Sequence, residues 1–157
     1  MKRKTFTGFI NKLNKNQVFV FGSNPEGRHG RGAAKVAVEK YGAIYGQGHG
    51  LQGNSYALVT KNLKKGYYDT VLGITYYKSG LRSISEKQII NNIKNLYKLA
   101  RNMKNTDFLI AYTAQGKNLN GYTSKEIAKL FYESKPIPKN IIFENKFLDL
   151  IYTKVKI

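Results

Sequence analysis

Short apolar runs alternate along the chain with longer segments in which apolar residues recur every three or four positions. Residues 18–21 (VFVF) form a continuous apolar run, which is typical of a strand buried on both faces of a parallel sheet. Residues 55–60 and 70–77 are rich in β-branched and aromatic residues and predict two more strands. Residues 107–113 and 140–144 complete the set of predicted strands.

Other segments have the periodicity of helices. Residues 32–41 carry an apolar stripe at helical spacing and predict the first helix. Ser83 and Glu86 have the spacing of a capping box, in which a hydroxyl and a carboxylate satisfy free N–H groups at a helix start. Thr123 and Glu126 repeat that spacing. A helix is therefore predicted after each of these two pairs.

The order of the elements predicts the fold class. Residues 146–155 add a terminal helix, so strands and helices alternate through most of the chain. This pattern indicates the α/β class, as a three-layer α/β/α sandwich with a mixed, largely parallel central sheet. We expect a single domain with its core in residues 18–144. Ligands of such sheets bind beyond the carboxyl ends of the strands, which directs attention to the loops after Phe21, near Tyr45 and after Thr113.

The composition excludes several classes of protein. The 157 residues include no Cys, which rules out disulfides, thiolate zinc sites and Cys nucleophiles. No apolar run approaches the roughly 20 residues that cross a bilayer. The basic N-terminal segment lacks the apolar stretch of a secretory signal. We therefore expect a cytoplasmic protein with no membrane partner.

The net charge of +18 arises from 27 Lys and Arg against 9 Asp and Glu. This excess favours polyanions or small phosphorylated ligands as partners. The Lys residues are scattered rather than gathered in one block, and Asn and Tyr are also abundant. An A/T-rich genome would produce the same bias without function, so the charge alone does not assign one.

Glycine is concentrated in three loops. Nine of the 15 glycines fall between Gly22 and Gly53. The first loop, residues 22–32, ends at a predicted helix start, where free N–H groups and the helix dipole favour an anion. Its sequence is neither a P-loop nor a dinucleotide-binding fingerprint. The second loop, residues 46–53, places four glycines just before a strand, and the third, residues 113–122, leads from a strand into a helix.

Two strand–loop–helix anion sites in one small domain predict a ligand with more than one polar anchor, such as a diphosphate joined to sugars. The alternative is that these glycines only allow tight turns.

In this order the loops resemble those of a macrodomain, the fold that binds ADP-ribose. Asn24 and the following GRHGRGAA resemble that family's Gly-rich run into a helix, and GLQGNSYALVT resembles its next strand. YTAQGKNLNGYTSKEIAKL is similar to its Ser/Thr–Gly loop, and NIIFE to its closing strand. The chain is also similar to a small group of phage-associated proteins with FGSN…GRHG…GAA and GY…EIA.LF.

The resemblance implies an ADP-ribose-type nucleotide as ligand, free, cyclic or protein-linked, and leaves open whether it is hydrolysed. A phage protein of this kind would remove or sequester a host NAD-derived immune signal in the host cytoplasm. Residues 30–34 would cradle the distal ribose, and residues 116–122 would wrap the diphosphate. Tyr122 would stack on a sugar or base, or simply pack.

No cofactor is expected, and two His on separate loops make a weak metal-ligand set. The ligand-binding residues implied are Gly22, Ser23, Asn24, Gly30, Arg31, Gly32, Ala33, Gly48, Leu51, Gln52, Thr113, Gln115, Gly116, Lys117, Asn118, Leu119, Gly121 and Tyr122.

Hydrolysis would need a general acid or base close to the ribose. His29 is the first catalytic candidate because histidine titrates near neutral pH; Glu26 is the second, with Arg28 as a charge stabiliser. The alternative is that His29 and Arg28 only donate hydrogen bonds to phosphate. Hydrolytic macrodomains often carry an Asp after the Gly run, where this chain has Ala33 and Ala34, and the family's acidic adenine-binding residue has no counterpart here.

A second class of function is a basic nucleic-acid-binding module without catalysis, using Lys, Arg and Tyr on an open face. The two hypotheses differ in their dependence on salt, because nucleic-acid binding weakens steeply with ionic strength. The sequence does not give the oligomeric state.

Overall fold

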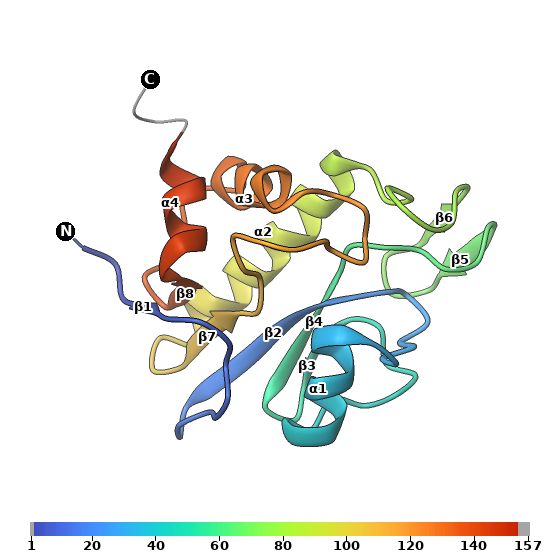
Figure 1. Cartoon of the computed structure of the whole chain (residues 1–157). Helices are drawn as coiled ribbons and strands as arrows, with labels where there is room; N and C mark the ends of the chain where they lie inside the picture. The colour runs from blue at the N-terminus through green and yellow to red at the C-terminus, as the bar shows by residue number, and fades with distance from the viewer. Residues whose placement is uncertain (1, 154–157) are drawn as a thin grey trace.

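The computed structural model describes residues 2–153. A six-stranded sheet with the order β1-β8-β7-β2-β4-β3 runs through the middle of the molecule (Figure 1). Every neighbouring pair is parallel except the antiparallel pair β3 and β4. The strands are β1 (Thr5–Phe6), β2 (Gln17–Ser23), β3 (Gly50–Gln52), β4 (Ser55–Val59), β7 (Asp107–Ile110) and β8 (Ile141–Glu144). The predicted α/β class with a mixed, largely parallel sheet is confirmed.

Four helices pack around this sheet, and a separate hairpin projects from it. The helices are α1 (Gly32–Lys40), α2 (Glu86–Asn102), α3 (Ser124–Glu133) and α4 (Asn145–Thr153). The hairpin consists of β5 (Tyr67–Asp69) and β6 (Ile74–Tyr76), and it lies at the side of the molecule away from both termini (Figure 1). None of the helices in residues 2–153 has the length and apolar character needed to cross a bilayer.

The central strand β2 contributes apolar side chains to both faces of the sheet. Its side chains alternate, so Phe19 and Phe21 join one apolar cluster while Val18 and Val20 join another. The first cluster includes α1, and the second includes α2, α3 and α4. A strand buried on both faces must be apolar at every position, which accounts for the continuous run in the sequence.

One of the two predicted capping boxes is correct. The Thr123 hydroxyl accepts a hydrogen bond from the Glu126 N–H, and the Glu126 carboxylate accepts one from the Thr123 N–H. The prediction for α2 was wrong by two residues, because Ser85 caps that helix by accepting from the N–H of Gln88. Ser83 instead accepts the backbone N–H of Asn62 at 2.8 Å.

Other boundaries also differ from the predictions. Residues 70–77 do not form one strand, because residues 70–73 turn the chain between β5 and β6. β7 ends at Ile110, and residues 111–113 leave the sheet. The terminal helix ends at Thr153, and residues 154–155 of the predicted helix lie outside the described part. The edge strand β1, which the sequence pattern did not predict, brings the N-terminal segment alongside β8.

Candidate functional site

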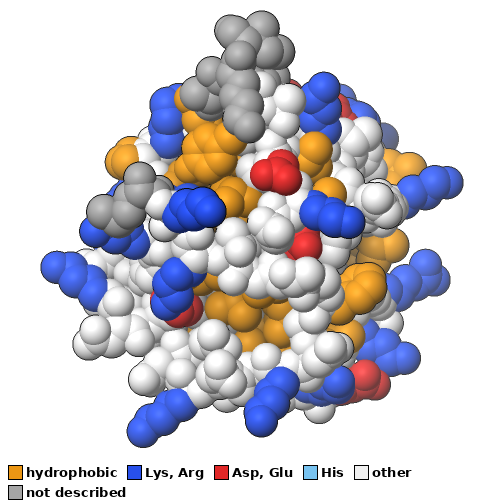
Figure 2. All heavy atoms as spheres, turned by 60° about the vertical axis from the view of Figure 1, so that its left-hand side comes forward, with side chains coloured by type: hydrophobic (Ala, Val, Ile, Leu, Met, Phe, Trp, Pro, Cys, Tyr) orange, Lys and Arg blue, Asp and Glu red, His pale blue; other side chains and the backbone are white. Residues whose placement is uncertain are grey.

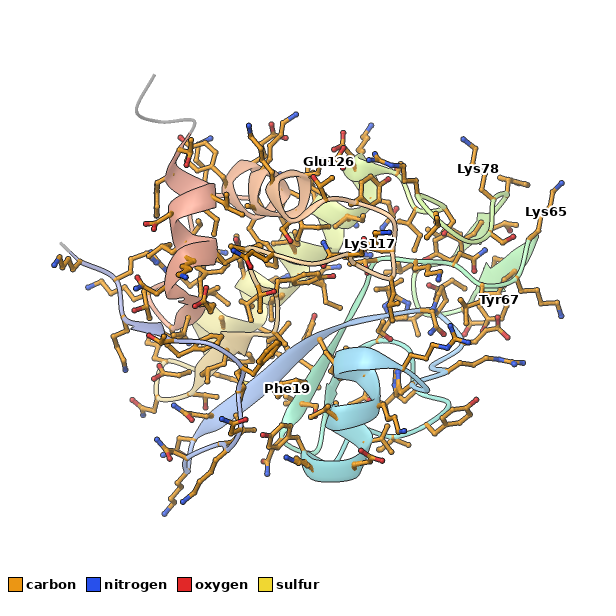
Figure 3. The ribbon with its side chains drawn as sticks, in the orientation of Figure 1. Phe19, Lys65, Tyr67, Lys78, Lys117 and Glu126 are labelled. Carbon is orange, nitrogen blue, oxygen red and sulfur yellow. The ribbon has the colours of Figure 1, made fainter. Side chains whose placement is uncertain are left out.

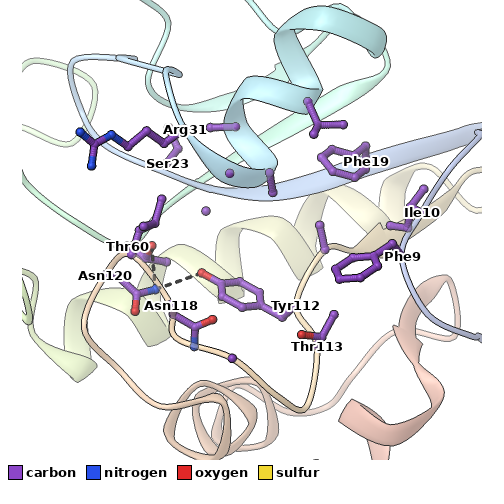
Figure 4. Close-up of a pocket in the computed structure, with 18 of the residues that line it drawn as sticks. Phe9, Ile10, Phe19, Ser23, Arg31, Thr60, Tyr112, Thr113, Asn118 and Asn120 are labelled. Carbon is purple, nitrogen blue, oxygen red and sulfur yellow. Dashed lines mark hydrogen bonds between the residues drawn. The ribbon is translucent and has the colours of Figure 1, made fainter.

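A cleft of about 970 Å³ opens where β2, β4 and β7 end. The strands are mutually parallel, so their carboxyl ends meet at one edge of the sheet, where ligands of open α/β sheets bind. Figure 4 shows this cleft, with the start of α1 on one side and the loop after β7 on the other. The volume is in the range of sites for drug-sized ligands.

The structure brings together most of the predicted ligand-binding residues. Those in the first loop and in residues 113–119 of the third loop line the cleft, although the two loops are far apart in sequence. They are Gly22, Ser23, Asn24, Gly30, Arg31, Gly32, Ala33, Thr113, Gln115, Gly116, Lys117, Asn118 and Leu119, together with Arg28. His29, Glu26, Gly48, Leu51, Gln52, Gly121 and Tyr122 are not among the lining residues.

The second glycine loop supports the first from behind and does not line the cleft. A Cβ at Gly48 would stand 2.3 Å from the carbonyl oxygen of Pro25, so only glycine lets the two loops approach this closely. The Ser23 hydroxyl donates to the Gly48 carbonyl at 2.9 Å. The Gln52 amide accepts from the Ile44 N–H at 2.8 Å, which fixes the loop internally. Gly48 and Gly53 thus serve packing between backbone segments, whereas Gly46 and Gly50 have positive φ and no atoms near the position that a Cβ would take.

Asn24 shapes the first loop. Its side-chain oxygen accepts the N–H of Arg28 at 3.0 Å, and its side-chain nitrogen donates to the Arg28 carbonyl at 3.1 Å. Both ends of the amide are therefore engaged within the loop. Asn24 holds the turn that carries Arg28 to the cleft.

Two of the three catalytic candidates lie outside the cleft lining. His29 is 2% exposed, and its Nε2 lies 2.8 Å from the carbonyl oxygen of Gln47. Glu26 is half-buried, with a carboxylate oxygen 3.5 Å from Nε of Arg28. Arg28 alone reaches the lining. The geometry therefore favours structural roles for His29 and Glu26.

Tyr122 also serves packing. Its hydroxyl donates to the carbonyl of Ile84 at 2.6 Å, and the Arg82 guanidinium lies 4.9 Å from its ring centroid. Gly121 has a positive φ of 88°, and a Cβ there would stand 2.8 Å from Cβ of Leu81. These contacts fix the end of the third loop against the segment before α2.

A polar network lies on the floor of the cleft and was not predicted. The Asn120 amide donates to the Tyr112 hydroxyl at 3.1 Å and to the Thr60 hydroxyl at 3.2 Å (Figure 4). Burial raises the pKa of Tyr112, and the hydrogen bonds from Thr60 and Asn120 offset only part of that effect, so the phenol stays protonated at neutral pH. Gly22 lies against this network.

The charges in the cleft have one sign. Five cations line it, and no Asp or Glu among residues 2–153 does; the cations are Arg28, Arg31, Lys40, Lys61 and Lys117. Figure 2 shows a hollow with a hydrophobic floor on one face of the molecule, with many Lys and Arg side chains and fewer Asp and Glu side chains around it. The start of α1 adds to this field, because its N-cap Arg31 makes no side-chain cap and its first turn has no acidic residue.

The other end of the cleft is apolar. Phe9 and Ile10 from the N-terminal segment lie there with Phe19 of β2 (Figure 4), and Val36 of α1 also lines the cleft. Phe9 is 81% exposed, which is unusual for an aromatic side chain and leaves its ring open to a ligand. The sequence feature that could have indicated this apolar end is the pair Phe9 and Ile10 within a basic segment. This pair lies outside the predicted strands and helices.

Comparisons of the chain with models of protein families, with curated proteins and with solved structures found no significant match. Within residues 2–153, no group of three or more His, Asp and Glu side chains converges as metal ligands would.

Proposed function

We propose that this protein has a macrodomain-like three-layer fold and binds an ADP-ribose-type nucleotide in the cleft at the carboxyl ends of β2, β4 and β7. The observation that carries the proposal is the division of the cleft into a cationic end around Arg31 and Lys117, without carboxylates, and an apolar end that includes an exposed aromatic ring and has Lys40 beside it. A nucleotide has the same two-part character, with phosphates and sugars at one end and a flat base at the other.

The cationic end suits a diphosphate. Arg31 begins α1, and Lys117 belongs to the opposite loop, so an anion between them would meet positive charge from both sides (Figure 3 labels Lys117). Gly32, Ala33 and Ala34 of the first turn of α1 line the same part of the cleft, and N–H groups in the first turn of a helix have no partner within the helix. Gly116, with a φ of 95° and no atoms near its missing Cβ, leaves the backbone open to a ligand.

The floor network suits a sugar. The hydroxyls of Thr60 and Tyr112 and the amide of Asn120 all lie among the lining residues. Hydroxyl groups both donate and accept, so they match the hydroxyls of ribose. At the apolar end, a purine would cover apolar side chains that otherwise face water, with Phe9 as the most exposed of them.

The proposal is for binding and sequestration of the nucleotide rather than for its hydrolysis. General acid–base catalysis needs a titrating group within hydrogen-bond reach of the reacting atoms. Among residues 2–153, no His, Asp or Glu lines the cleft. A phage protein that holds a host NAD-derived signal without cleaving it would need only the binding groups described above.

Isothermal titration calorimetry with ADP-ribose, cyclic ADP-ribose, ADP and adenosine tests the proposal. ADP-ribose or its cyclic relative should bind at micromolar concentration or below, and adenosine at least about tenfold more weakly, because it lacks the phosphates. Chromatography of the same mixtures should show the nucleotide unchanged.

The double variant Arg31→Ser/Lys117→Ser should lose most of this affinity. Lys94→Ser/Lys98→Ser is the matched control, because it removes the same charge from exposed positions on α2 and should bind as the parent does. Absence of heat with all four ligands, or equal loss in both double variants, would refute the proposal.

A further inference from the structure

The segment from Lys40 to Ser85 is almost free of carboxylates. It contains six Lys and Arg residues and a single acidic residue, Asp69, which is 2% exposed. Asp69 accepts hydrogen bonds from Nε2 of His49 at 2.6 Å and from the Tyr76 hydroxyl at 2.8 Å. The segment therefore carries an excess of positive charge, although Arg82 pairs with Glu126 of α3, and it includes the β5–β6 hairpin.

The two faces of the hairpin carry tyrosines with different surroundings. Tyr67 pairs with Tyr76 in the register of the hairpin, and both belong to or pack against the apolar cluster that includes α2, α3 and α4. Tyr68, opposite Thr75, is 56% exposed, and Tyr77, just after β6, is 77% exposed. Because side chains alternate along a strand, Tyr68 and Tyr77 share the outward face. Burial of an apolar core does not explain this pair.

Three lysines lie next to the hairpin strands in the sequence. Lys64 and Lys65 precede β5, Lys78 follows β6, and all three are exposed. The buried Asn62 donates from its side-chain nitrogen to the carbonyls of Lys64 and Lys78, each at 2.8 Å, which holds the two chain segments side by side. Figure 3 shows Lys65 and Lys78 extending from the hairpin away from the body of the molecule.

Hydrogen bonds hold the hairpin at its turn and at its base. One Asp69 oxygen accepts the N–H groups of Val71 and Leu72 at the turn, while the other is bonded to Tyr76 and to His49 of the second glycine loop. A hairpin fixed at its turn and at its base presents its outward rings and lysines without a large ordering cost on binding.

We infer that the hairpin surface, formed by Lys64, Lys65, Tyr68, Tyr77 and Lys78, binds single-stranded nucleic acid. Exposed aromatic rings stack on unpaired bases, and the neighbouring lysines neutralise the phosphates between those bases. A duplex keeps its base faces covered, so it would use the lysines alone. This surface is separate from the cleft residues, and the inference does not depend on the nucleotide proposal.

Fluorescence anisotropy with labelled oligothymidine and oligouridine of about 12 nucleotides tests the inference. Tyr68→Leu and Tyr77→Leu should each weaken binding roughly fivefold to a hundredfold, whereas Tyr68→Phe and Tyr77→Phe should retain it, because phenylalanine keeps the aromatic face. These side chains are exposed, so the variants should fold as the parent does, which circular dichroism can verify.

Salt dependence tests the role of the lysines. Replacing Lys64, Lys65 and Lys78 with Ser should reduce the slope of log affinity against log salt by about 2, the value for three phosphate contacts on a single strand. The matched control replaces three exposed lysines on α2 and in the turn after it, Lys94, Lys98 and Lys104. The control should leave both the affinity and the slope near those of the parent.

Three outcomes would overturn the inference. The first is equal affinity of the Leu and Phe variants, and the second is an equal effect of the two lysine triples. The third is a preference for vesicles containing phosphatidylserine, or for an acidic protein, over the oligonucleotides. The cleft variant Arg31→Ser/Lys117→Ser should bind the oligonucleotides as the parent does, so failure of one proposal can be told from failure of the other.

Discussion

The imidazole of His29 is hydrogen-bonded to the backbone of Gln47, with 2.8 Å between Nε2 and the carbonyl oxygen. Its ring also meets Phe21 nearly perpendicularly, with 5.0 Å between the centroids. One buried side chain thus joins the first glycine loop to the second loop and to the core under α1. These contacts make His29 a support for the cleft wall rather than a group that faces the ligand.

His29→Ala should therefore change stability more than ligand binding. The variant loses a buried hydrogen bond and an edge-to-face aromatic contact, which together are expected to lower the free energy of unfolding by about 2 kcal/mol. Urea denaturation followed by circular dichroism measures this loss. ADP-ribose affinity, measured well below the unfolding midpoint, should stay close to that of the parent. A variant of unchanged stability that no longer binds would instead place His29 at the ligand.

Gly22 should be intolerant of a side chain because of the network on the cleft floor. A Cβ there would stand 2.7 Å from the Tyr112 hydroxyl oxygen, so Gly22→Ala must push Tyr112 away from Asn120. We expect a loss of about 1–3 kcal/mol in stability, the usual cost of overpacking, and weaker nucleotide binding.

The rescue variant for this position is Tyr112→Phe. It removes the clashing hydroxyl, and the Asn120 amide keeps its bond to Thr60. In the double variant Gly22→Ala/Tyr112→Phe, the loss should be smaller than the sum of the two single losses. Strict additivity in the thermodynamic cycle would show that the clash is not the cause.

Local patterns predicted the buried strand β2 because a strand covered on both faces must be apolar throughout. They also predicted the capping box at Thr123, where spacing alone defines the contacts. At α2 Ser83 and Glu86 have the same spacing, but the Ser83 hydroxyl is hydrogen-bonded to the backbone of Asn62, and Ser85 caps the helix instead. The spacing of a capping motif does not show whether one of its residues has a hydrogen-bond partner elsewhere in the chain.

The site was predictable only in part for the same reason. The first and third loops follow parallel strands, so their convergence follows from topology. The second loop contains the antiparallel edge strand β3, and its Gly48 faces the backbone of Pro25 rather than the cleft. The N-terminal segment reaches the cleft through the short strand β1, whose two residues have no periodicity to detect.

Asp69 should make part of the protein's stability dependent on pH. Burial alone would raise its pKa, but the hydrogen bonds from His49, Tyr76 and the Leu72 N–H, together with the electrostatic attraction of His49, outweigh burial and hold the pKa below the ordinary value of 3.8. A carboxylate with a lowered pKa binds fewer protons in the folded state than in the unfolded state. Its stabilising contribution is therefore present above the unfolded pKa and is lost as the pH falls through the folded pKa.

Asp69→Asn should be less stable than the parent at neutral pH, and it should lose less further stability between about pH 5 and pH 2. Urea denaturation across this range measures both effects. The control is Asp149→Asn, an exposed position on α4 that should leave the pH profile near that of the parent. Parallel profiles for the parent and Asp69→Asn would show that this carboxylate is not the acid-sensitive group.

Ala33→Asp should weaken anion binding at the start of α1 while changing the stability of the protein little. Ala33 lies in the first turn of α1, which has no acidic residue, and it lines the cleft. An aspartate there gains about 0.3–1 kcal/mol from the helix dipole and loses a similar amount in helix propensity, so stability should change little. Its carboxylate would nevertheless lie where a phosphate of the ligand would bind and would repel that phosphate, so ADP-ribose affinity should fall at least about tenfold.

Ala33→Asn provides the control for this last variant. The amide has nearly the same shape without the charge, so it should reduce the affinity much less than Ala33→Asp, and calorimetry on the two proteins gives the comparison directly. Equal losses would attribute the effect to bulk at the start of α1, and the phosphates would then have to lie elsewhere in the cleft. A selective loss in Ala33→Asp would place negative charge of the ligand at this helix terminus, because only the sign of the charge distinguishes the two side chains.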